Sequence, residues 1–215
     1  MDAQRAGTGY LALPEGREGP GVLVLHAWWG LTDHVRDVCD QLAAEGFVAL
    51  APDLFDGRVA TEIDEAQQGL AEVAPDVLAH LTRSSLHTLR TLPHTPDGAV
   101  GVVGFSMGAS MALWLAARVP HAVAATAVFY GDQEIDMVTA TSAFLGHFAE
   151  HDDYVDDDTL TLLEAELHLD DLEVEFHRYP GTRHWFAEPD RPEHDPEAAA
   201  LAWQRTVHFL HEKLG

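Results

Sequence analysis

The sequence predicts a single α/β domain in which helices cover both faces of a mostly parallel sheet. Apolar runs of strand length alternate with helical segments of ten or more residues, as crossover connections between parallel strands require. Runs such as Val22 to Leu25 are continuously apolar, which is typical of strands buried on both faces. With 215 residues, 47% of them hydrophobic, and no linker or internal repeat, the chain suits one domain with a sizeable core.

Seven segments are expected to form the sheet. The last of them, 172–179, alternates apolar and charged residues, as a strand near the sheet edge does. The other six are 8–13, 22–25, 47–51, 100–103, 121–130 and 140–149. Helices are expected between Asp33 and Gly46 and over 62–74, 76–92, 109–119, 160–169 and 196–214.

Local signals predict where the helices begin and end. Thr32 or Asp33 can cap the first helix, because a short polar side chain accepts hydrogen bonds from free amides. Gly46 can end that helix, since glycine adopts the left-handed conformation readily. Pro75 separates two helices, and Asp156 to Asp158 provide an acidic start that complements the helix dipole.

The charge composition disfavours several classes of partner. The chain has 36 acidic and 12 basic residues, a formal charge of −24, and Lys213 is its single lysine. Such a field repels phosphate backbones and anionic membrane surfaces, so we expect no nucleic-acid and no membrane partner. The expected substrate is a small molecule that is uncharged or weakly charged. The composition leaves a monomer and a small homo-oligomer both open.

The sequence also predicts a cytoplasmic protein. No apolar run is long enough to span a membrane, and residues 1–16 lack a basic region followed by a hydrophobic stretch. The single cysteine, Cys39, excludes a framework of intrachain disulfides. Because Cys39 falls on the apolar face of a predicted helix, we expect it to be a small core residue.

The most informative stretch is Gly104-Phe105-Ser106-Met107-Gly108, which lies between an apolar strand and a helix of small residues. This is the context of a nucleophile elbow, in which a sharp strand-to-helix turn projects a serine hydroxyl beyond the sheet. Gly104 and Gly108 remove side chains that would collide with neighbouring backbone. The amide of Met107, at the helix start, is then placed to stabilise an oxyanion.

A nucleophilic serine needs a histidine as base and a carboxylate that orients the histidine. In an open α/β sheet these groups are expected in loops after the carboxyl ends of later strands. Asp152 and Asp153 lie in one such loop, 148–155, and His184 lies in the next, 179–186. The order serine, aspartate, histidine is that of α/β-hydrolases, and the spacing leaves both aspartates open as the acid.

Other residues have a structural and a functional interpretation. His26 is expected to form structural hydrogen bonds that brace the loop after it, and not to carry protons. Trp28 and Trp29 can pack in the core or form an apolar pocket for an acyl group. The histidines and aspartates of 147–158 have no recognised metal spacing, so we expect neither a metal ion nor a cofactor.

Five segments together resemble the dienelactone hydrolase family over about residues 21–214. They are 22–30, Ala51-Pro52-Asp53-Leu54-Phe55, the elbow pentapeptide, His151-Asp152-Asp153-Tyr154-Val155 and Gly181-Thr182-Arg183-His184-Trp185-Phe186. The resemblance implies an α/β-hydrolase fold with Ser106 as nucleophile, Asp152 as acid and His184 as base. It also implies that the amides of Trp28 and Met107 donate to the oxyanion.

Three positions depart from the family pattern. The family enzyme has a cysteine nucleophile where this chain has Ser106, and a glutamate that serves the thiol where this chain has Ala27. The two changes agree, because a serine activated directly by histidine does not need that carboxylate. The family enzyme also has an arginine for a substrate carboxylate, near the position of Glu188. A dienelactone is therefore disfavoured as the substrate.

The sequence thus predicts a serine hydrolase for a small ester, lactone or thioester. Candidate pocket residues are Trp29, Phe55 and Trp185, and the variable wall that selects the substrate is expected over 55–74. The pocket should be small, because the helices between Phe55 and the elbow strand are short and no lid domain is present. The alternative is a non-catalytic member of the same fold that binds a ligand.

Overall fold

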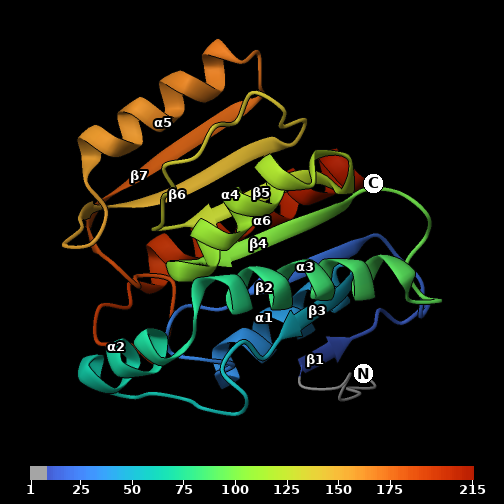
Figure 1. Cartoon of the computed structure of the whole chain (residues 1–215), viewed down its shortest axis with the longest axis horizontal. Coiled ribbons are helices and arrows are strands. Elements are labelled where there is room, and N and C mark those ends of the chain that lie inside the picture. Colours follow the sequence, from blue (N-terminus) through green and yellow to red (C-terminus); the bar gives the residue numbers. More distant parts are fainter. Residues whose placement is uncertain (1–8) are drawn as a thin grey trace.

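The computed structural model describes residues 9–215, which form one α/β domain (Figure 1). Seven strands make a single sheet in the order β1-β3-β2-β4-β5-β6-β7. They are β1 (Gly9–Ala12), β2 (Gly21–Leu25), β3 (Val48–Pro52), β4 (Val100–Phe105), β5 (Val123–Phe129), β6 (Ala143–His151) and β7 (Val174–Arg183). Strand β1 pairs antiparallel with β3, and the other neighbours are parallel, so the predicted fold class is confirmed.

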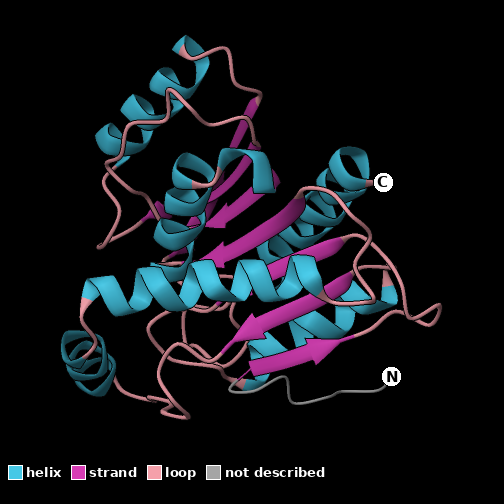
Figure 2. Ribbon diagram, turned by 45° about the vertical axis from the view of Figure 1, so that its right-hand side comes forward, coloured by secondary structure: helices cyan, strands magenta, loops and turns pink. Residues whose placement is uncertain are grey.

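Helices cover both faces of the sheet (Figure 2). They are α1 (Asp33–Ala44), α2 (Ile63–Glu72), α3 (Pro75–Thr91), α4 (Met107–Arg118), α5 (Asp157–Leu169) and α6 (Pro196–Leu214), with a short 3₁₀ turn at Pro120–Ala122. Helices α1 and α6 pack on one face, and α3, α4 and α5 pack on the other. Of these described helices, none is long and apolar enough to cross a membrane.

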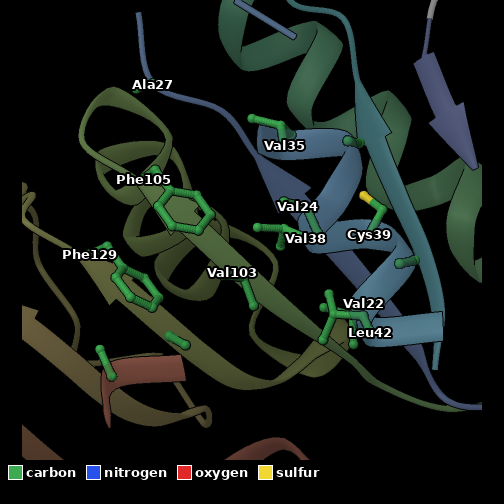
Figure 3. Packing of buried hydrophobic residues seen from close by; sticks show 14 of the residues in the cluster. Val22, Val24, Ala27, Val35, Val38, Cys39, Leu42, Val103, Phe105 and Phe129 are labelled. Carbon is green, nitrogen blue, oxygen red and sulfur yellow. The ribbon is translucent and has the colours of Figure 1, made fainter. Parts of the chain in front are cut away.

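The core on the α1 face shows why β2 and β4 are continuously apolar. Side chains of these two strands pack against the apolar stripe of α1 (Figure 3). Cys39 lies on that stripe and is fully buried, so its predicted place in the core is confirmed. Burial of apolar surface on both faces contributes about 25 cal/mol per Å², which favours Val, Leu and Ala at every position of a central strand.

The predicted elements are all present, and their ends differ by a few residues. The first predicted strand began at Thr8, which lies outside the described residues. Asp156 caps α5 as expected, because its side chain accepts two backbone hydrogen bonds. Gly46 follows α1 with φ +96°, and Pro75 opens α3. Thr32 precedes α1, but its side chain makes no capping hydrogen bond, so that expected contact is absent.

Candidate active site

Ser106 occupies the sharp turn between β4 and α4. Its backbone has φ 50° and ψ −115°, a conformation that costs a non-glycine residue about 1–3 kcal/mol. The amide of Ser106 donates to the Phe129 carbonyl at 2.9 Å, which ties the turn to β5. A side chain at Gly104 would collide with the backbone of Gly108, and one at Gly108 with the Leu25 carbonyl. Both glycines are therefore required by close backbone approach, as predicted.

The structure brings Ser106, His184 and Asp152 into one hydrogen-bonded chain. Ser106 Oγ lies 2.9 Å from His184 Nε2, and His184 Nδ1 lies 2.8 Å from both carboxylate oxygens of Asp152. Asp152 Oδ1 also accepts hydrogen bonds from the amides of Tyr154 and Val155 at 2.8 and 3.0 Å. Because an ionised carboxylate only accepts, His184 donates from Nδ1 and its Nε2 is free to accept from the serine hydroxyl.

The sheet topology explains how three distant residues meet. Ser106 follows β4, Asp152 follows β6 and His184 follows β7, all at the carboxyl edge of the parallel sheet. That edge is where open α/β sheets bind their ligands. The side chains of His184 and Asp152 are only 4% and 6% exposed, so their interaction is weakly screened by solvent. The other candidate acid, Asp153, is exposed and lies outside this chain of hydrogen bonds.

The loop after β2 carries Trp28, the other candidate oxyanion donor beside Met107. His26 holds this loop in place and is fully buried. Its Nδ1 donates to the Ala27 carbonyl at 2.7 Å, and its Nε2 accepts from the Leu54 amide at 3.1 Å. Burial lowers the pKa of His26, which keeps Nε2 unprotonated and able to accept. This bonding agrees with the predicted bracing role. Among the described residues, neither the Trp28 amide nor the Met107 amide finds an acceptor.

An aromatic cluster joins the loop after β2, which carries Trp28 and Trp29, to Tyr154 and Trp185 beside His184. The rings of Trp28, Trp29 and Trp185 lie 5.0–6.0 Å from one another, and Tyr154 packs on His184 at 4.8 Å. Trp29 and Trp185 are 2% and 4% exposed, whereas Tyr154 is 46% exposed. Trp28 is partly exposed, so it and Tyr154 present more surface than the two buried tryptophans do.

Phe55 lies where the loop after β3 meets α2 and α3. It is 7% exposed, and its ring contacts the His26 ring at 5.3 Å. Phe55 and Leu54 form a small apolar cluster with Leu78, against which Trp28 and Met107 pack. A cavity of about 490 Å³ opens beside this cluster, between the 53–58 loop, α2 and the start of α3. The region expected to form the variable wall thus borders a cavity.

Two of the three departures from the family pattern, Ala27 and Glu188, are buried. Ala27 is 2% exposed and belongs to the core on the α1 face (Figure 3). Glu188 is also 2% exposed, and its Oε1 accepts a hydrogen bond from the hydroxyl of Tyr130 at 2.9 Å. Burial raises the pKa of Glu188 to about 8. Sequence reasoning missed Tyr130, although its place at the end of the predicted strand 121–130 was a signal that it lies at the carboxyl edge.

Three of the residues considered for a metal site, His147, Asp152 and Asp156, are engaged in other hydrogen bonds. His147 is fully buried between the Tyr179 hydroxyl at 2.8 Å and the Thr206 hydroxyl at 2.9 Å. Asp152 is bound to His184, and Asp156 caps α5. Within residues 9–215, no group of three or more His, Cys, Asp or Glu side chains could hold a metal ion.

The fold and the hydrogen-bonded serine, histidine and aspartate define the class of α/β-hydrolase folds. Within that class, residues 8–214 match the family model of the dienelactone hydrolase family, and the chain belongs to that family. Protein usf of Aquifex pyrophilus is 32% identical over 216 residues, which cover 96% of this chain and 93% of that protein.

Solved structures show the same fold. A dienelactone hydrolase-like promiscuous phosphotriesterase from metagenomic libraries is 26% identical, with a TM-score of 0.84 and coverage of 96% of this chain and 92% of that chain. The dienelactone hydrolase from Anabaena variabilis is 22% identical, with a TM-score of 0.72 and the same two coverages. The second likeness supports the fold alone.

Proposed function

We propose that this protein is a serine hydrolase that cleaves a small carboxylic ester, lactone or thioester through an acyl-enzyme. The observation that carries the proposal is the hydrogen-bonded chain from Ser106 Oγ through His184 to Asp152, with contacts of 2.9 and 2.8 Å. A serine hydroxyl is a weak nucleophile until a neighbouring base takes its proton. The distance from Ser106 Oγ to His184 Nε2 is short enough for that transfer.

In the first half of the reaction, Ser106 Oγ attacks the substrate carbonyl while its proton moves to His184 Nε2. Asp152 stabilises the imidazolium that forms, and the amides of Trp28 and Met107 donate to the oxyanion of the tetrahedral intermediate. His184 then gives the proton to the leaving oxygen or sulfur as the bond to the carbonyl carbon breaks, which leaves an acyl ester on Ser106.

In the second half, water replaces the leaving group. His184 takes a proton from water as its oxygen attacks the acyl carbon, and returns it to Ser106 Oγ as the acid product departs. The charge of −24 favours a substrate without a strong negative charge. The cytoplasm is the expected compartment for such an enzyme.

A fluorophosphonate probe tests the proposal directly. We expect the purified protein to be labelled once, with the adduct mapped by mass spectrometry to the peptide that contains Ser106. Ser110→Ala is the matched control, because Ser110 lies one helical turn away and its hydroxyl donates to the Asp132 carbonyl at 2.6 Å. That variant should label as the unmutated protein does. Folded protein that does not label would instead favour a non-catalytic, ligand-binding member of the fold.

The substrate class is resolved by a panel of p-nitrophenyl esters of increasing acyl length, compared with lactones and thioesters.

Ala27→Glu offers a second test within the same assay, since it restores the carboxylate of the family pattern. We expect no gain in kcat/KM and a less stable protein, because residue 27 is buried in the apolar core and an ionised carboxylate is costly there. Ala27→Gln has the same size without the charge and should be less harmful. A clear gain from Ala27→Glu would show that serine does need that carboxylate.

A further inference from the structure

Two buried polar residues, Tyr130 and Glu188, lie near His184 and take no part in the proposed reaction. Tyr130 directly follows β5, the strand between β4 and β6, which carry Ser106 and Asp152 at their ends. It is fully buried with φ 40°, and its amide donates to the His147 carbonyl at 2.8 Å. Its ring lies 4.9 Å from the ring of His184.

Glu188 joins the tyrosine to the chain just after His184. Its amide donates to the Trp185 carbonyl at 2.9 Å, so it belongs to the turn that begins at the histidine. Its carboxyl group accepts from the Tyr130 hydroxyl at 2.9 Å across 58 residues of sequence. The hydrogen bond therefore connects the end of β5 with the turn that carries His184.

A buried acid at this place calls for a physical reason. Burial of a carboxyl group is unfavourable, and an apolar pair of similar size would pack without that penalty. The Tyr130 ring, in contrast, contacts His184 and Phe186 and is fixed at its far end by the carboxyl group. A ring fixed in this way limits the directions in which the imidazole can turn.

We propose that Tyr130 and Glu188 are positioning residues, which together hold the His184 imidazole in line with Ser106 Oγ. The role rests on the proposed function, because it matters only if His184 transfers the serine proton. Neither residue is required to touch substrate. Loss of the pair should therefore lower kcat, through a misplaced base, and leave KM nearly unchanged.

The protonation state of Glu188 gives the proposal a second readout. Its pKa is raised to about 8, chiefly by burial, so at neutral pH the group is mostly an uncharged acid. The charged and titratable groups around the pair are Tyr130, Asp190, Arg191 and Glu193 around Glu188, and Asp152 and Asp190 around Tyr130. Ionisation above pH 8 places a buried charge in the turn that carries His184, and hydration of that charge requires this turn to shift from its place beside Tyr130.

Three variants and one control test the role on a single activated ester. Glu188→Leu and Tyr130→Phe remove the hydrogen bond, and we expect kcat to fall about tenfold with KM within about twofold. Glu188→Gln keeps an acceptor for the hydroxyl and should retain kcat within about twofold. Tyr179→Phe is the matched control, because it removes a buried tyrosine hydroxyl that hydrogen-bonds His147 instead. It should leave kcat unchanged.

The pH dependence of kcat is a second test, and it still applies if Glu188→Leu or Tyr130→Phe fails to fold. For the unmutated protein we expect kcat to decline above pH 8, and for Glu188→Gln we expect that decline to be absent. Full kcat in both Glu188→Leu and Tyr130→Phe, or an unchanged alkaline decline in Glu188→Gln, would overturn the positioning role alone. An unmutated protein that hydrolyses no ester would overturn the proposed function and this role together.

Discussion

Substitution of Asp152 by asparagine is expected to lower kcat/KM about 10⁴-fold, or roughly 5 kcal/mol of transition-state stabilisation. The reason lies in the contacts of the carboxylate. The amides of Tyr154 and Val155 both donate to Oδ1, so an asparagine would keep its carbonyl oxygen there. Its amide nitrogen would then occupy the position of Oδ2, which is 2.8 Å from His184 Nδ1.

An amide nitrogen at that place donates to Nδ1 and shifts the imidazole proton to Nε2. A protonated Nε2 cannot accept the proton of Ser106, although the three side chains keep their positions. Asp153→Asn is the matched control, because Asp153 is exposed and adjacent in sequence, and it should cost about tenfold or less. Both variants are compared by kcat/KM on one activated ester, with folding checked by circular dichroism. The reverse ranking would move the acid to Asp153.

Glu188→Gln is expected to stabilise the protein at neutral pH. The folded pKa of Glu188 is about 8 and the ordinary value is 4.5, so the folded state binds more protons than the unfolded state between these values. Stability is therefore greatest below pH 4.5 and falls as the pH rises toward 8. At about 1.4 kcal/mol per pH unit, the loss at pH 7 is about 3 kcal/mol. Glutamine is neutral at every pH, so the Glu188→Gln variant does not suffer this loss of stability.

Urea unfolding of both proteins from pH 4.5 to pH 8 measures this difference. The free energy of unfolding of Glu188→Gln should exceed that of the unmutated protein by an amount that grows steadily from pH 4.5 to pH 8 and changes little above pH 8. Glu166→Gln changes an exposed glutamate on α5 and should leave the pH dependence unaltered. Parallel stability curves for the unmutated protein and Glu188→Gln would show that Glu188 is ionised in the folded state at neutral pH.

Local patterns in the sequence were sufficient for the architecture. The continuous apolar runs identified the central strands, and the two glycines around Ser106 identified the turn, because its backbone geometry depends on residues only a few positions apart. The α6 helix was predicted over 196–214, the range it occupies, since a proline and an apolar periodicity delimit it. Element ends elsewhere shifted by a few residues, because tertiary contacts decide how far a strand pairs.

The spatial relations within the candidate site could not be read from such patterns. Sequence spacing left Asp152 and Asp153 equivalent, and the register of β6 together with the turn after it decided which carboxylate faces His184. The sequence marked Glu188 as a departure from the family pattern, but its burial against Tyr130, 58 residues away, is a property of the packed sheet. The sequence by itself determined the fold class and the sharp turn at Ser106, because the strand and helix patterns and the two glycines are local features. Only the tertiary structure decided the hydrogen-bond partners and the protonation of Glu188, because these depend on desolvation by distant elements.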